Sequence, residues 1–88
     1  MMEKSEYNIS FGKYIKSLRK LKGWSQIDLS EKLGNNYQNV SAIERGEYSI
    51  ILYSTQKIAD AFEIPLSSLI LGFEQSLTEK DKSSGEVN

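Results

Sequence analysis

Amide and hydroxyl side chains are concentrated in one short segment, residues 36–45, at spacings that could place them on one side of a helix. If Val40 points inward and each residue turns about 100°, Ile43 and Glu44 also point inward. The side chains left facing outward are Gln38, Ser41, Ala42 and Arg45, with Tyr37 and Asn39 to either side. Gln and Asn amides can pair bidentately with adenine, and a small apolar side chain can contact a thymine methyl. Taken alone, this pattern permits either recognition of A·T base pairs or simply a soluble, exposed helix.

Two short helices joined by a tight turn are predicted to position these side chains. Ser25 can cap the first helix, and Asp28 three residues later gives a weaker form of the capping box, in which Asp replaces Glu or Gln. Gly34 stands where a left-handed residue would end that helix, and Asn36 can cap the next one. Two helices joined in this way cross steeply, and the small Ser30 allows a close approach. The spacing therefore predicts a helix-turn-helix.

Three further helices are predicted around this pair. The first would begin at a cap on Ser10 and end at Gly23, with an apolar stripe of Phe11, Tyr14, Ile15, Leu18 and Leu21. After a loop at 47–51, another helix is expected from about 52 to 62, and a short last helix from Leu66 to Gly72 after Pro65.

The segment from Ser25 to Gly46 resembles the Cro and phage-repressor family, also called the xenobiotic-response-element (XRE) type. The matching residues are Ser25-Gln26 before Leu29, Gly34 at the turn, and the run VSAIERG that ends at Gly46. The resemblance extends from about Ile15 to Leu69. It implies an all-α, five-helix, λ-repressor-like DNA-binding domain at residues 9–72, with flexible tails at 1–8 and 73–88 that we expect to be disordered.

The resemblance also implies roles for particular side chains. The helix from about 36 to 45 would enter the major groove, so the expected base contacts are Tyr37, Gln38, Asn39, Ser41 and Ala42. Gln26 would begin a helix, where backbone N–H groups favour a phosphate, and the expected phosphate contacts are Gln26, Asn36, Arg45 and Lys22. Arg19 and Glu44 would form a partly buried structural ion pair. The chain departs from the family pattern at Ile50 and Ile51, and at Thr55, where Leu is common.

Composition argues against an enzyme. Cysteine and histidine are both absent, which removes thiolate metal sites, the usual zinc ligand and the usual general base. The sequence also lacks a Gly-rich phosphate loop and a paired-carboxylate constellation. We therefore expect no catalytic residues, no metal and no cofactor.

The charge distribution is compatible with DNA, although the net charge of the chain is −1. Between Ile9 and Gly72, eight basic residues stand against six acidic ones, and five of the basic residues lie between Lys13 and Lys22. These could face a phosphate backbone, or they could form an ordinary solvated helix face. No apolar run approaches the ~20 residues that span a bilayer, and the N-terminus lacks a signal-peptide core. We expect no membrane partner and a cytoplasmic location.

Apolar residues near the C-terminus exceed what one face of two short helices needs; they are Ile50, Ile51, Leu52, Leu66, Leu69, Ile70, Leu71 and Phe73. Either they complete the core or some form a patch for a second copy. Because the family generally dimerises through its C-terminal helices, we expect a homodimer that reads two half-sites about one DNA turn apart. The expected function is a transcriptional regulator, either a repressor or a controller. The alternative is a protein-binding module, such as an antitoxin whose main partner is a toxin protein.

Overall fold

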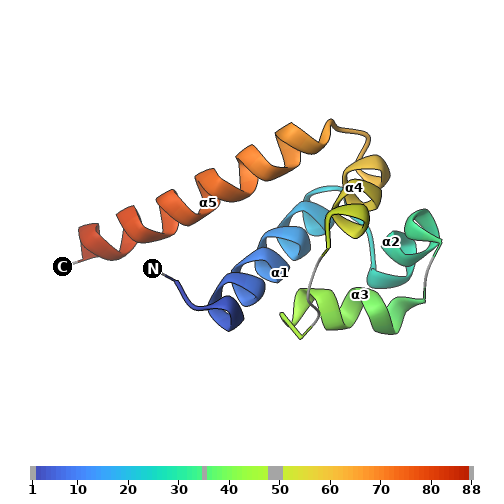
Figure 1. Ribbon diagram of the computed structural model, residues 1–88, viewed down its shortest axis with the longest axis horizontal. Helices are drawn as coiled ribbons and strands as arrows, with labels where there is room; N and C mark the ends of the chain where they lie inside the picture. The colour runs from blue at the N-terminus through green and yellow to red at the C-terminus, as the bar shows by residue number, and fades with distance from the viewer. Residues whose placement is uncertain (1, 35, 48–50, 88) are drawn as a thin grey trace.

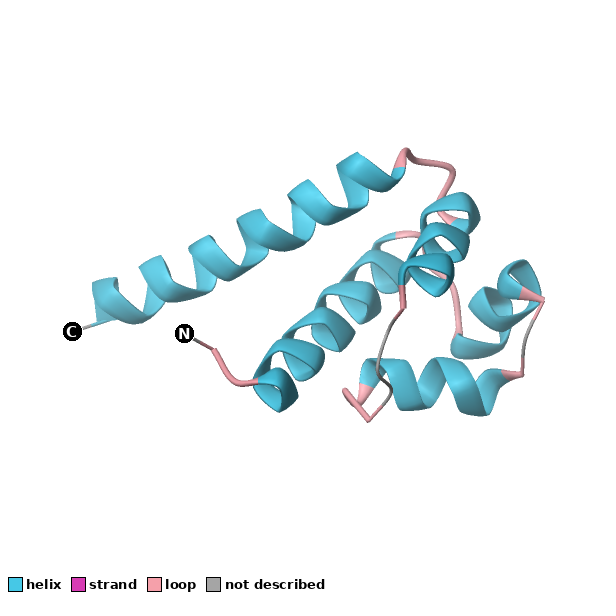
Figure 2. Ribbon diagram, viewed as in Figure 1, coloured by secondary structure: helices cyan, strands magenta, loops and turns pink. Residues whose placement is uncertain are grey.

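The five elements are all helices, as the resemblance implies (Figures 1 and 2). The structure is a computed structural model that describes the backbone of residues 2–34, 36–47 and 51–87, and the side chains of these residues up to Thr78. The helices are α1 (Lys4–Leu21), α2 (Gln26–Leu33), α3 (Tyr37–Glu44), α4 (Leu52–Ala61) and α5 (Leu66–Val87). Within those described ranges there is no strand, so the all-α, five-helix prediction is confirmed.

The boundaries of α2 and α3 follow from side-chain caps. Ser25 Oγ accepts from the Asp28 N–H at 3.0 Å, and Asp28 Oδ2 accepts from the Ser25 N–H at 2.8 Å, which completes a reciprocal capping box. The bond from the Ser25 backbone N–H to the Asp28 carboxylate is the main cause of a lowered pKa at Asp28, and the nearby Ser25 side chain lowers it further. Gly34 then ends α2 in the left-handed conformation, and Asn36 Oδ1 accepts from the Asn39 N–H to open α3.

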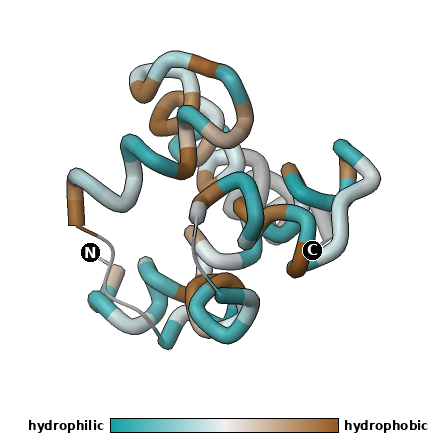
Figure 3. The backbone as a smooth tube through the Cα atoms, turned by 90° about the vertical axis from the view of Figure 1, so that its right-hand side faces the viewer, coloured by the Kyte–Doolittle hydropathy of each residue, from teal (hydrophilic) through white to brown (hydrophobic). Residues whose placement is uncertain are grey.

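The core lies where all five helices meet. Apolar and polar residues are interspersed along the helices (Figure 3), as expected for helices with one buried face. The hydrophobic core is a cluster of buried side chains that consists of Phe11, Ile15, Leu29, Leu33, Val40, Ile58, Ala59, Phe62, Leu69 and Phe73.

A glycine sets the distance between α1 and α3. A Cβ atom on Gly12 would clash with the carbonyl oxygen of Ile43 and would lie 2.6 Å from that of Glu44. Both are backbone atoms, which cannot rotate away. The two helices can therefore be this close only because residue 12 has no side chain, and the sequence analysis did not identify this role.

The first helix ends before the left-handed Gly23 as predicted, but it differs from the prediction in where it begins and in the exposure of Leu21. It begins at Lys4 rather than after Ser10, so residues 4–7 are helical rather than an irregular tail. The reason lies in α5, because the Tyr7 ring packs edge-on against Phe73 with 5.1 Å between ring centroids. At the other end, Leu21 is 83% exposed rather than part of the apolar stripe. It lies about 120° around the helix from the fully buried Ile15.

The last helix continues through Gly72, where the sequence predicted its end, and runs back along α1 to Val87 (Figure 1). Residues 73–87 are therefore helical where a polar, disordered tail was expected. Phe73 explains the continuation: it is 2% exposed and packs against the rings of Phe11 and Tyr14. Gly72 makes room for Tyr14, whose hydroxyl group would clash with a Cβ atom there. The limits of the DNA-binding domain at 9 and 72 stay a prediction.

The connection between α3 and α4 was predicted as a loop at 47–51, and residues 48–50, including Ile50, lie outside the described residues. Beyond the loop, α4 begins at Leu52 as expected. Thr55 is buried, and its hydroxyl group donates to the Ile51 carbonyl oxygen at 3.0 Å, which satisfies a polar group at a position where the family often has Leu.

Candidate nucleic-acid interface

Helix α3 lies at one edge of the molecule, with one face packed and the other directed outward (Figure 1). Its inner face contacts α1 and α2. Val40, Ile43 and Glu44 are buried on that face, which is the inward direction predicted from the sequence. Because α3 is held along one side by two other helices, the side chains on its opposite face are presented on a fixed scaffold.

The five residues expected to contact bases all reach the surface of α3. Tyr37 is 51% exposed and Gln38 is exposed, while Asn39, Ser41 and Ala42 are partly exposed. None of them is buried in the interior, so their positions permit the predicted contacts. The contacts themselves stay a prediction.

An ion pair anchors α3 to α1. Arg19 Nε donates to Glu44 Oε2 at 2.7 Å, and Arg19 Nη2 donates to Glu44 Oε1 at 3.0 Å. Arg19 Nη1 also donates to the Trp24 carbonyl oxygen at 2.7 Å. The hydrogen bonds to Glu44 are the main cause of a raised pKa at Arg19. The pair that the resemblance implies is therefore present, and it joins two helices rather than contacting solvent.

Gln26 is tied to this ion pair. Its Nε2 donates to Glu44 Oε1 at 3.1 Å, a hydrogen bond that the sequence analysis missed. Gln26 is the first residue of α2 and is partly exposed, as a phosphate contact requires. Its amide is thus oriented by the same carboxylate that receives Arg19, and the scaffold and the predicted phosphate contact share one network.

Arg45, another expected phosphate contact, already has anionic and polar partners. Its Nε donates to Glu47 Oε2 at 2.8 Å and its Nη2 to Glu47 Oε1 at 3.1 Å. Arg45 Nη1 also donates to Ser41 Oγ. Hydrogen bonding to Glu47 is the main cause of a raised pKa at Arg45, and the same bonding is the main cause of a lowered pKa at Glu47. Sequence reasoning missed Glu47, and the available signal was an acid two residues after an expected phosphate contact.

The other two expected phosphate contacts are in different settings. Asn36 uses its side-chain carbonyl oxygen to cap α3. Lys22 is exposed at the C-terminal end of α1, in the basic segment that begins at Lys13. The structure therefore places Asn36 and Arg45 at opposite ends of α3, and Lys22 at the end of α1.

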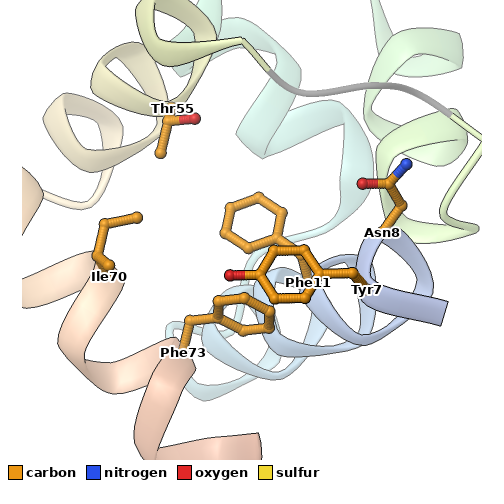
Figure 4. Close-up of a pocket in the computed structure, with 6 residues that line it drawn as sticks. All are labelled: Tyr7, Asn8, Phe11, Thr55, Ile70 and Phe73. Carbon is orange, nitrogen blue, oxygen red and sulfur yellow. The ribbon is translucent and has the colours of Figure 1, made fainter. Parts of the chain in front are cut away.

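In the ranges that the structure describes, no group of three or more acidic residues could hold a metal ion. A pocket of about 200 Å³ lies between α1, α4 and α5, and Tyr7, Asn8, Phe11, Thr55, Ile70 and Phe73 line it (Figure 4). It contains no residue of α3, and all six lining residues are uncharged. No described helix is long and apolar enough to cross a bilayer.

Comparisons with known proteins agree with this geometry. A family model described as helix-turn-helix matches residues 15–69. Over 55 residues the chain is 38% identical to YgzD of Bacillus subtilis (strain 168), an uncharacterised HTH-type transcriptional regulator, and the match covers 62% of this chain and 83% of that protein.

Solved structures of regulators have the same fold. The restriction-modification controller protein C.AhdI from Aeromonas hydrophila is 29% identical with a TM-score of 0.71, and the match covers 77% of this chain and 99% of C.AhdI. The hypothetical transcription factor NHTF from Neisseria is 27% identical with a TM-score of 0.70, over 89% of this chain and 90% of NHTF. The clp gene regulator ClgR from Corynebacterium glutamicum has a TM-score of 0.78 at 16% identity, over 92% of this chain and 86% of ClgR, which shows a shared fold.

Proposed function

We propose that this protein binds double-stranded DNA in a sequence-specific way. The premise is that the chain belongs to the helix-turn-helix family of transcriptional regulators. The observation that carries the proposal is the division of α3 into a buried face, around Val40, and an outward face, around Gln38. A helix held in this way can lie in the major groove with its N-terminal residues against base edges. Gln38 and Asn39 would then favour adenine, and Ala42 a thymine methyl group.

Contacts to the DNA backbone would fix the orientation of α3. Gln26 begins α2 and carries an amide oriented by Glu44, and Lys22 lies in the basic end of α1. Such contacts position a protein on DNA without selecting a sequence. We assign sequence reading to α3 and positioning to Gln26, Lys22, Asn36 and Arg45.

A homodimer is the second part of the proposal. Large apolar side chains are exposed at the start of α4 and on α5, namely Ile51, Leu52, Tyr53, Ile70 and Leu71; we call them the apolar patch. Leu52 and Tyr53 are 74% and 69% exposed. Ile70 also lines the pocket between α1, α4 and α5, which could receive an apolar side chain of a second copy (Figure 4). A dimer would present two copies of α3 to half-sites about one DNA turn apart.

The relatives support a regulatory role by analogy. C.AhdI, which is 29% identical, is a restriction-modification controller. By analogy we propose a repressor or controller that acts on DNA in the cytoplasm.

DNA binding can be tested without knowing the operator. Duplexes selected by the protein from a random oligonucleotide pool would be compared with unselected duplex at low and moderate salt. We expect the selected duplexes to share a consensus and to bind more tightly, and the affinity for unselected duplex to fall steeply with salt because bound Lys and Arg release counterions. Salt-independent binding, or a selected pool with no consensus, would contradict the proposal.

The dimer has its own test. Leu52→Glu and Leu71→Glu each place a charge in the apolar patch, whereas Leu21→Glu places one on α1 at a side chain that is 83% exposed. Sedimentation equilibrium should show dimers for the wild type and for Leu21→Glu, and monomers for at least one patch variant. Monomers at every concentration for the wild type would overturn the homodimer.

The apolar patch also favours a second candidate, a protein-binding module such as an antitoxin that neutralises a toxin protein. The net charge of −1 fits this candidate better than it fits DNA. The salt titration separates the two, because a protein-binding module would leave random duplex unbound even at low salt.

A further inference from the structure

Arg45 is clamped at the end of the outward face of α3. It follows the last residue of α3, and its guanidinium group donates two hydrogen bonds to the Glu47 carboxylate, at 2.8 and 3.1 Å. A third nitrogen, Nη1, donates to Ser41 Oγ. The Arg45 and Glu47 side chains are 54% and 60% exposed, so the pair lies on the surface with the predicted DNA contacts.

We propose that Glu47 competes with DNA phosphate for Arg45 and so limits the affinity of the protein for DNA of any sequence. The inference rests on the proposed DNA-binding function and assigns a role to a residue outside the predicted contact set. A carboxylate and a phosphate both accept two parallel hydrogen bonds from a guanidinium group, so each can occupy the same donors of Arg45.

Exchange of these partners has two physical consequences. Before Arg45 can present its Nε and Nη2 donors as a pair to a phosphate, it must leave Glu47, and the freed carboxylate then lies near the phosphate and repels it. Because the pair is well exposed, solvent screening makes it weak, and exchange is accessible. In the free protein the positive charge of Arg45 is already neutralised, so less counterion release remains to drive binding.

The same exchange affects base reading. Arg45 Nη1 holds the Ser41 hydroxyl group, and Ser41 is a predicted base contact. When Arg45 moves to a phosphate, this hydroxyl group becomes available to the groove. Glu47 would therefore restrain Arg45, a predicted phosphate contact, and through Arg45 it would restrain Ser41, a predicted base contact.

Binding to a random-sequence duplex tests the proposal, since Arg45 is a predicted phosphate contact. Glu47→Gln keeps the side-chain shape and removes the charge. We expect it to bind about 3- to 10-fold more tightly at low salt, with a slope of log affinity against log salt that is steeper by about 0.9. Glu74→Gln makes the same charge change at an exposed position on α5 and should change affinity far less. Circular dichroism would verify that each variant is folded.

A double-mutant cycle separates the clamp from a general charge effect. Arg45→Gln should weaken binding slightly in the wild type and strongly in the Glu47→Gln background, because Arg45 is then fully available. An equal gain from Glu47→Gln with and without Arg45 would overturn the clamp while leaving DNA binding intact. The same conclusion would follow if Glu47→Gln bound DNA with unchanged affinity and slope. Absence of binding by both the wild type and Glu47→Gln would overturn the proposed function and this inference together.

Discussion

Arg19 and Glu44, 25 residues apart in the sequence, are joined by two hydrogen bonds that tie the last turn of α1 to the end of α3. The two side chains are 9% and 3% exposed, so water screens their attraction poorly. Gln26 donates to the same carboxylate. One buried acid therefore links α1, α2 and α3, and the position of the outward face of α3 depends on it.

Loss of one partner of this pair should be costly. Arg19→Met leaves the Glu44 carboxylate buried without its main partner, and we expect a loss of about 3–5 kcal/mol in the free energy of unfolding, measured with urea. The double variant Arg19→Met/Glu44→Met removes both charges and should lose less than the single variant, because no buried charge is left unpaired.

The exposed ion pair between Arg45 and Glu47, which lies just after α3, gives a matched control. Arg45→Met breaks the ion pair between Arg45 and Glu47. Because both of these side chains are more than half exposed, we expect little change in the free energy of unfolding. If Arg19→Met were as mild as Arg45→Met, the Arg19 pair would not be the anchor of α3.

Sequence reading and positioning should separate on mutation. Gln38→Ala removes an exposed amide from α3, so we expect reduced discrimination between operator variants in a competition assay. Gln26→Ala should weaken binding to all duplexes about equally, because a phosphate contact carries no base information.

The hydrogen bond from Gln26 to Glu44 adds a condition to this experiment. Gln26→Ala also removes a partner of a buried carboxylate, so its affinity must be compared at a temperature where the variant is fully folded. Equal losses on selected and random duplex for Gln38→Ala would remove Gln38 from the base-reading residues.

Local signals explain why the centre of the fold could be predicted from the sequence. Ser25, Gly34 and Asn36 act within a few residues along the chain, and each does in the structure what its residue type favours. The inward direction of Val40 likewise needs only the period of a helix. The pairing of Arg19 with Glu44 came from the family resemblance, since no local pattern joins residues so far apart.

The features that could not be predicted depend on contacts between distant segments. Gly72 predicts a helix end from local sequence alone, but α5 continues beyond it because Phe73 packs against Phe11. Tyr7 is helical because its ring meets Phe73. Gly12 is an ordinary glycine in the sequence, and its role appears only when α3 is placed beside it.

That close approach gives a third prediction. Gly12→Ala places a methyl group against the carbonyl oxygens of Ile43 and Glu44, which are backbone atoms, so α1 and α3 must move apart. We expect a loss of about 1–3 kcal/mol in the free energy of unfolding, despite the better helix propensity of Ala, together with weaker DNA binding. Gly72→Ala meets the end of the Tyr14 side chain, which can move, and should cost less. A larger loss for Gly72→Ala would contradict this account.

The capping box at the start of α2 should make stability depend on acid. The pKa of Asp28 is lowered in the folded protein, so its carboxylate contributes stability that is fully present above the unfolded pKa, about 3.9, and is lost as pH falls through the folded value. Asp28→Asn keeps the shape but removes the charge that also favours a helix N-terminus. Urea unfolding at pH 7 should find Asp28→Asn less stable than the wild type, and the difference should shrink towards zero as pH falls below 4. A difference that stayed constant with pH would mean that the hydrogen-bonding shape of residue 28, and not its charge, holds the start of α2.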